Sequence, residues 1–184
     1  MSIFKACVLL LATLVFTTGP VFAEDHSLST LTGPGIDLKT YDHAFAGSIR
    51  DFVAWGNMDH DSFTSELIMK RNGTTIKAVF GQKEEAHGGK FIGGEIRSSQ
   101  DSVETVTALR FVKIDRDNST IVMNINGEDV NVVVTADSFE NNHFQNPTYK
   151  TEFRGQAIEF TLKGEACFGY STHLLFMILG AMVH

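Results

Sequence analysis

The chain has 184 residues, of which 43% are hydrophobic, and its 22 acidic and 15 basic residues give a formal net charge of −7. An acidic surface repels phosphate backbones, and no basic stripe offsets it, so we do not expect nucleic-acid binding. The length suits one domain with a sizeable core, and no linker divides the chain.

The first 23 residues have the order of a secretory signal peptide. Lys5 precedes an apolar run from Ala6 to Phe16, and residues 21–23 place small side chains at the two positions that a signal peptidase reads. The run is too short to span a membrane. We therefore predict cleavage after Ala23, a secreted or periplasmic location, and a single β-rich domain over residues 24–184.

The cysteines point to the same compartment. Cys7 would leave with the leader, so Cys167 would remain alone and no intramolecular disulfide could form. Small secreted eukaryotic domains are more often cross-linked by disulfides. A protein of the bacterial envelope or extracellular space fits this usage better.

The segment after the leader predicts an arm followed by a helix. Residues 24–36 are rich in Ser, Thr, Gly and Pro, which predicts an extended or flexible arm. Beyond them, Asp37 stands where a helix N-cap would lie and Gly56 where a helix commonly stops. Apolar residues between these two recur at three- and four-residue spacing, which predicts an amphipathic helix packed on a sheet. They are Leu38, Tyr41, Phe45, Ile49, Phe52 and Val53.

Two Asn-Gly pairs predict β-hairpins, because Asn-Gly supplies the positive φ angles of a type I′ turn. The turn at 126–127 pairs Met123 with Val130, and the turn at 72–73 pairs Leu67 with Ala78. Each register gathers apolar residues on one face. A third hairpin is centred on Arg154-Gly155, with Tyr149, Phe153, Ile158, Phe160 and Leu162 on its inner face.

Two further runs, Lys90–Arg97 and Glu104–Ile114, complete a meander. The second run is apolar on both faces, which predicts a strand covered on both sides. The expected fold class is mainly β: one antiparallel meander of about eight strands that forms a barrel or a sandwich. Charged outward positions such as Lys70 and Asp129 argue against a barrel facing lipid.

The carboxy end, His173–Val183, is apolar all round and rich in Leu and Met. Such a segment favours a helix buried on every side, beginning near Ser171 or Thr172 as a cap. A helix of this length cannot cross a bilayer. We expect it to plug a barrel or cover a sheet; the alternative is a segment that docks on a partner or a membrane surface.

Candidate metal ligands cluster in the loop Asp59-His60-Asp61, to which His87 or His143 could add a second imidazole. Carboxylate and imidazole groups on a flexible loop can hold a divalent cation. No spacing here matches a recognised metal motif, so a solvated polar loop is the competing interpretation, and we predict no bound cofactor.

No catalytic residue is predicted. Cys167 has no basic neighbour in the sequence to lower its pKa, which favours a buried structural thiol over a nucleophile. Ser171 lacks the second glycine of a nucleophile elbow. Carboxylates paired in sequence, such as Glu84-Glu85, lie in or beside expected turns.

Three functional hypotheses follow from the sequence, in which no motif indicates a known family. The leading one is an exported, soluble, non-enzymatic binding protein whose partner is a small apolar ligand inside the barrel or another protein, as in inhibitor- or immunity-type proteins. The second is a barrel enzyme, a metal-dependent hydrolase or isomerase that uses the loop at residues 59–61. The third is a component of an envelope assembly that docks through its apolar carboxy end.

Overall fold

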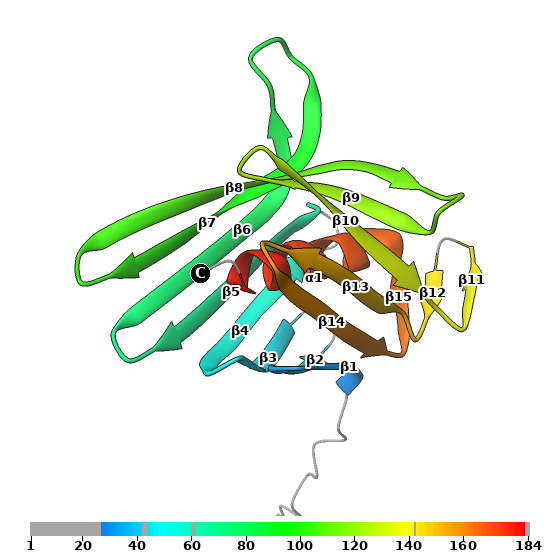
Figure 1. Cartoon of the computed structure of the whole chain (residues 1–184), viewed down its shortest axis with the longest axis horizontal. Coiled ribbons are helices and arrows are strands. Elements are labelled where there is room, and N and C mark those ends of the chain that lie inside the picture. Colours follow the sequence, from blue (N-terminus) through cyan, green and yellow to red (C-terminus); the bar gives the residue numbers. More distant parts are fainter. Residues whose placement is uncertain (1–26, 42–43, 60–61, 142, 183–184) are drawn as a thin grey trace, which may run out of the picture.

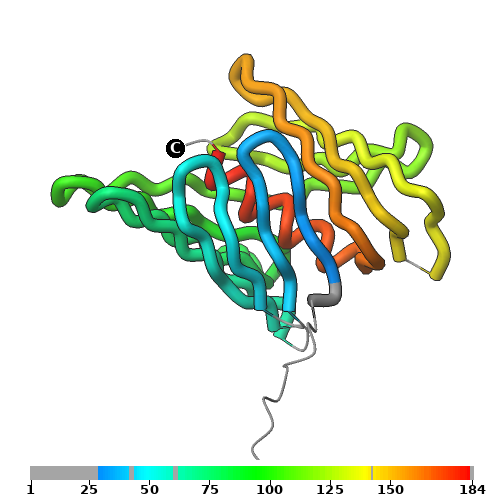
Figure 2. Tube along the Cα trace, turned by 90° about the horizontal axis from the view of Figure 1, so that it is seen from below, coloured from blue at the N-terminus to red at the C-terminus, as the bar shows by residue number. Residues whose placement is uncertain are grey.

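The computed structural model describes residues 27–41, 44–59, 62–141 and 143–182, and the predicted leader lies outside them. In this part of the chain, twelve antiparallel strands close into a barrel around one helix, and three short strands form a separate sheet beside it (Figures 1 and 2). The barrel strands are Ser27–Gly33 (β1), Ile36–Tyr41 (β2), Ala44–Ile49 (β3), Phe52–Asp59 (β4), Thr64–Arg71 (β5), Thr74–Glu84 (β6), Lys90–Gln100 (β7), Val103–Asp115 (β8), Thr120–Ile125 (β9), Glu128–Thr135 (β10), Thr148–Phe153 (β13) and Gln156–Lys163 (β14). The small sheet contains Ser138–Glu140 (β11), His143–Gln145 (β12) and Glu165–Cys167 (β15), and the helix is Phe168–Met182 (α1).

The barrel closes through its first strand. Neighbouring strands follow chain order from β1 to β10, and β13 and β14 then complete the ring. On its two sides β1 pairs with β2 and β14, placing Leu31 opposite both Leu38 and Leu162. Residues 27–33 are therefore extended, but they form a barrel strand rather than the predicted arm. Their alternation is hard to detect because Thr and Ser occupy most positions of the strand.

The three predicted hairpins are confirmed, the first two with their registers. Met123 pairs with Val130 across β9 and β10, and Leu67 pairs with Ala78 across β5 and β6. The third hairpin is formed by β13 and β14, and its predicted inner face is buried. At the first two turns Asn126, Gly127, Asn72 and Gly73 all have positive φ, as the turn chemistry requires.

The predicted helix over residues 37–56 is wrong: this segment forms β2, β3 and β4. Its apolar spacing arises because the chain reverses twice within twenty residues, so inward positions of three short strands mimic a helical stripe. Phe45 and Phe52 face the core, but Tyr41 and Val53 of the expected stripe are exposed. Gly47 has φ 151°, and a Cβ there would lie 2.1 Å from the carbonyl oxygen of Asp37, so close strand contact requires a glycine. Together with β1, these three strands bring the number of barrel strands from the expected eight to twelve.

The strand β8 is also covered less than predicted. Thr107 and Leu109 face the core, whereas Val106 and Val112 are exposed large hydrophobic residues on the other face. The register shifts between Phe111 and Lys113, as at a β-bulge. The prediction of cover on both sides of this strand is therefore wrong.

The prediction that the apolar carboxy segment is a core helix is confirmed. All residues of α1 from Ser171 to Met182 are buried within the ring of strands. Phe176 stacks on Phe80 with ring centroids 3.8 Å apart. A Cβ at Gly180 would lie 1.4 Å from Cδ1 of Ile96, so a larger residue there would require the Ile96 side chain to move.

The start of α1 differs from the prediction. The helix begins at Phe168, and the backbone N–H of Tyr170 donates to Sγ of Cys167 at 3.3 Å. Thr172 is not a cap, because its hydroxyl donates to the carbonyl oxygen of Phe168 within the helix. Among the described residues, no helix has the length and apolar character needed to cross a membrane.

Candidate ligand-binding pocket

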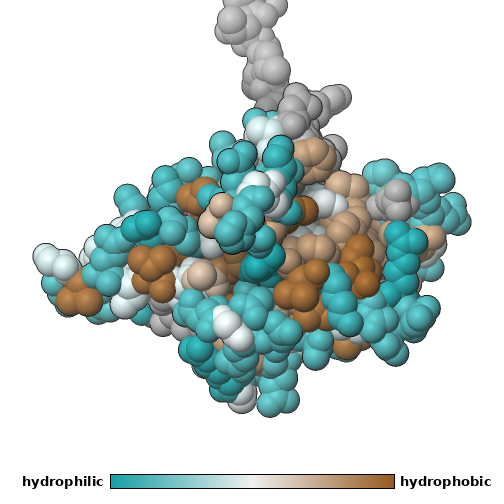
Figure 3. Space-filling model, turned by 90° about the horizontal axis from the view of Figure 1, so that it is seen from above, coloured by the Kyte–Doolittle hydropathy of each residue, from teal (hydrophilic) through white to brown (hydrophobic). Residues whose placement is uncertain are grey.

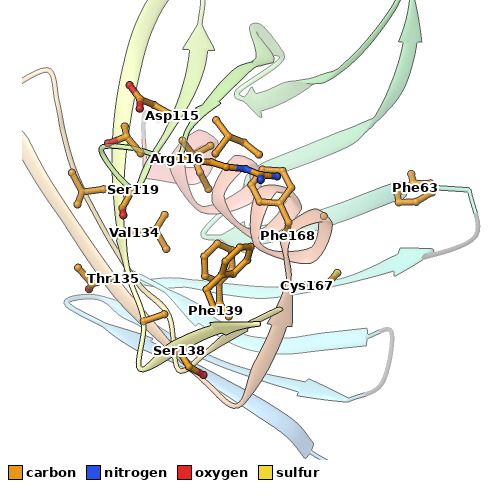
Figure 4. A pocket seen from close by; sticks show the side chains of 17 residues that line it. Phe63, Asp115, Arg116, Ser119, Val134, Thr135, Ser138, Phe139, Cys167 and Phe168 are labelled. Atoms are coloured by element: carbon orange, nitrogen blue, oxygen red, sulfur yellow. The ribbon is translucent and has the colours of Figure 1, made fainter. Parts of the chain in front are cut away.

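An open pocket of about 980 Å³ lies at the end of the barrel where α1 begins. Five parts of the chain surround it: Phe63 just before β5, the β8–β9 connection, the end of β10, the small sheet and the start of the helix (Figure 4). Its lining residues are Phe63, Ile114, Asp115, Arg116, Ser119, Thr120, Ile121, Val133, Val134, Thr135, Ala136, Ser138, Phe139, Phe144, Cys167, Phe168 and Gly169. Its size is at the upper end of small-molecule pockets, which usually measure about 300–1,000 Å³.

Four phenylalanines, Phe63, Phe139, Phe144 and Phe168, belong to the pocket wall. Phe139 and Phe144 lie 4.5 Å apart between ring centroids, and Phe168 meets Phe111 edge to face at 6.0 Å. Phe63 is 57% exposed and Phe139 48% exposed, although both belong to the same apolar lining. Seen from above, apolar surface gathers to the right of the centre of the molecule, and smaller apolar areas lie on its left (Figure 3). Such an exposed apolar cluster is typical of a binding site.

The small sheet positions two of these rings. Phe139 of β11 is paired with Phe144 of β12, which is paired with Ala166 of β15. Asn146 fixes the connection, since its side chain donates to Asp137 and accepts from the N–H of Gly164, each at 2.8 Å. The sheet therefore presents two aromatic rings to the pocket and leads the chain from β14 into α1.

The charged lining residues are Asp115 and Arg116, at the end of β8. The carboxylate of Asp115 accepts hydrogen bonds from the side chain and the backbone N–H of Asn118, at 3.0 and 3.2 Å, and these bonds lower the pKa of Asp115. Figure 4 shows the Asp115 carboxylate turned away from the pocket and the Arg116 side chain extending over it in the direction of Phe168. The pocket thus has an apolar wall and a positive group at its mouth.

Cys167 forms part of the wall and is half-buried rather than fully buried as predicted. Strand pairing places His143 directly opposite it. Nδ1 of His143 is shared between the carbonyl oxygen of Asn141 at 2.9 Å and, more distantly, Glu165 at 3.8 Å. The sulfur in turn accepts from the N–H of Tyr170, so its visible role is to support the start of the helix.

The predicted metal ligands are spread over the molecule. Asp59 ends β4 and accepts from the N–H of Ser62 at 3.2 Å, whereas His60 and Asp61 lie outside the described residues. His87 lies in the β6–β7 connection, which Figure 1 shows well apart from β12, the strand of His143. Within the described part of the chain, no three His, Cys, Asp or Glu residues gather in a way that could hold a metal ion. The loop at residues 59–61 remains a prediction.

Sequence reasoning missed a set of polar groups inside the barrel. His173 of α1 shares a 2.8 Å hydrogen bond with Ser65 of β5 and contacts the edge of Phe80. Ser29 and Thr40 also share a buried hydrogen bond. Two signals were available in the sequence: the register of the β5–β6 hairpin placed Ser65 inward, and His173 opened the carboxy segment that was expected to be buried. These groups face the packed helix, so they fix its position rather than line the pocket.

The Tyr149 hydroxyl belongs to the same interior. It is buried near the hydroxyl of Ser171, which offsets part of the effect of burial on the pKa of Tyr149, but neither hydroxyl makes a hydrogen bond of standard geometry within the described residues. Burial raises the pKa of Tyr149, and burial also raises that of Tyr170.

The pocket is therefore suited to holding a molecule by its apolar surface, with a few polar groups to orient it. Ser119, Thr135 and Ser138 supply hydroxyls at its rim. No family model matches this chain, and no curated protein or solved structure is significantly similar to it.

Proposed function

We propose that this chain is a binding protein that holds a small, mainly apolar ligand in the pocket at the end of the barrel. The observation that carries the proposal is the half-open pocket of about 980 Å³ walled by Phe63, Phe139, Phe144 and Phe168. Covering exposed phenylalanine surface removes apolar area from water, which contributes roughly 25 cal/mol per Å². A ligand seated here would gain that contribution at little reorganisation cost, because the small sheet already holds two of the rings.

The site differs from the one expected from the sequence. A ligand inside the barrel would have to displace α1, whose residues from Ser171 to Met182 are buried. The end pocket requires no such displacement. The same burial argues against docking through the carboxy end, because the apolar residues of the helix already serve as core.

Export belongs to this proposal and rests on the first 23 residues of the sequence. We expect protein recovered from the extracellular or periplasmic fraction to begin at Glu24. Intact-mass analysis of that fraction tests this directly, and a mass that includes the leader would contradict it.

Ligand binding is tested with 1-aminoanthracene, a neutral fluorescent probe that brightens in apolar sites. We expect saturable binding to the wild-type protein, weakened about ten-fold by Phe139→Ala, because one wall of the pocket is removed. Tyr41→Ala is the matched control, since Tyr41 is an exposed aromatic residue outside the pocket lining. Absence of saturable binding, or equal losses in both variants, would contradict the proposal.

A further inference from the structure

The arginines of this chain differ in how their charge is satisfied. The sequence contains six, and five of them bond a side chain that neutralises or occupies the guanidinium. The pairs are Arg50 with Gln156, Arg71 with Asp51, Arg97 with Glu95 and Glu104, Arg110 with Glu85, and Arg154 with Glu128. The sixth, Arg116, has no side-chain hydrogen bond or ion pair within the described residues. It is also the arginine that lines the pocket.

The surroundings of Arg116 leave its charge available to a ligand. Two carboxylates flank it in the sequence: Asp115 is directed away and bonded to Asn118, and Asp117 forms no ion pair with it in the described structure. The backbone carbonyl of Arg116 accepts from the N–H of Ser119 at 3.3 Å, which fixes the turn that carries the side chain. A guanidinium presents several N–H donors in a planar fork that matches a carboxylate.

We propose that the pocket ligand is a monomeric amphiphile, with an apolar body against the phenylalanine wall and a carboxylate head at Arg116. This inference rests on the proposed function and adds the chemical class of the ligand. The chain is acidic as a whole, so a general attraction for anions does not explain such binding. Because Arg116 is exposed at the pocket mouth, we expect the ion pair to orient the ligand and add a modest share of affinity.

The test measures displacement of 1-aminoanthracene by laurate, kept below its micelle concentration so that the monomer is the ligand. We expect Arg116→Gln to weaken laurate about five-fold, in line with an exposed ion pair. The neutral probe should keep its affinity within about two-fold in the same variant. Arg116→Lys should retain most of the laurate affinity.

Lys113→Gln is the matched control. It removes one positive charge from the same end of β8, but Lys113 does not line the pocket. We expect it to change laurate affinity less than about two-fold, because general surface charge is screened by salt. Phe139→Ala should weaken laurate and the neutral probe by similar factors.

The outcomes separate the two proposals. If the neutral probe does not bind, or Phe139→Ala leaves its affinity unchanged, the proposed function fails and this inference fails with it. If the probe binds in the pocket but laurate does not displace it, the carboxylate head is wrong and the binding function stands. The carboxylate head is also wrong if Arg116→Gln and Lys113→Gln weaken laurate equally.

Discussion

The interior of the barrel and the pocket at its end contain the same kind of residue in opposite states. Inside, Phe80 and Phe176 stack at 3.8 Å and are almost completely buried. At the pocket, Phe139 and Phe144 also pair, at 4.5 Å, but Phe139 is about half exposed. Both regions adjoin α1, the first along its body and the second at its start.

The difference shows how the lumen of this barrel is filled. Its lumen would be wide enough to hold a ligand, but an apolar helix occupies it and is packed to near contact at Gly180. At the end of the barrel the small sheet stands beside the strands without covering them, and apolar surface remains in contact with water. We therefore expect substitutions in the interior to lower the stability of the fold. Substitutions in the pocket should mainly weaken ligand binding.

The largest expected effect is loss of the native fold when α1 is removed. Deletion of residues 168–184 would remove the packing partner of the inward apolar side chains of the barrel and leave them in contact with water. We expect the truncated protein to lose its near-UV circular dichroism and its cooperative thermal transition. A truncated protein that unfolds cooperatively would show that the helix is an appendage instead of core.

Removing one phenylalanine ring from each region should lower the free energy of unfolding by different amounts. Phe176→Ala should lower the free energy of unfolding by about 3–5 kcal/mol, as expected for a fully buried phenylalanine. Phe139→Ala should cost at most about 1 kcal/mol, because its ring is half exposed. Urea unfolding of both variants measures the contrast, and comparable losses would contradict the division between core and pocket.

The buried hydroxyl of Tyr149 gives a prediction on pH. Burial raises the pKa of Tyr149 in the folded state above the value of about 10 in an unfolded chain. Below about pH 10 the Tyr149 hydroxyl is neutral in both the folded and the unfolded chain, and its contribution to stability is complete. That contribution is lost as the pH rises above this value, because only the unfolded chain then ionises readily.

Tyr149→Phe should remove this tyrosine's share of the alkaline loss. It should also stabilise the protein by about 1 kcal/mol near neutral pH, because the buried hydroxyl makes no hydrogen bond of standard geometry within the described residues. Urea midpoints from pH 7 to 11 check both effects, with the exposed Tyr41→Phe as control. A neutral-pH loss in Tyr149→Phe would indicate that the hydroxyl is satisfied.

The smallest expected effect on stability is that of Arg116→Gln. Its guanidinium has no described partner, so the free energy of unfolding should change by less than about 0.5 kcal/mol. Thermal and urea unfolding without ligand test this. Arg71→Gln, which breaks a described ion pair, is the comparison. A larger loss for Arg116→Gln than for Arg71→Gln would place the side chain in a structural role.

Turn chemistry explains which parts of the fold could be predicted. Asn72-Gly73 and Asn126-Gly127 set their hairpins locally, so their registers were correct before any tertiary contact was known. The prediction for the segment from β2 to β4 was wrong because its strands are short and its turns lack the Asn-Gly pair. At one of these turns Arg50, with φ 54°, takes the position that glycine usually fills.

The pocket was not predictable for a different reason. Phe63, Arg116, Phe139 and Cys167 lie far apart in the sequence and come together only when the barrel closes. Neighbouring His and Asp residues were the visible chemical signal, but the described structure keeps Asp59, His87 and His143 on separate elements. No spacing of neighbouring residues in the sequence marks an apolar pocket, so its position can be found only from the topology of the whole barrel.

The central claim is that α1 fills the barrel and leaves the end pocket as the binding site. A methyl-resolved NMR titration with 1-aminoanthracene tests it most directly, because the ring currents of the probe shift only nearby methyl groups. We predict shifts at Ile114 and Val134, which line the pocket, and none at Ile178 and Leu179 in the body of the helix. Shifts at Ile178 and Leu179 without shifts at Ile114 would place the ligand inside the barrel and contradict this claim.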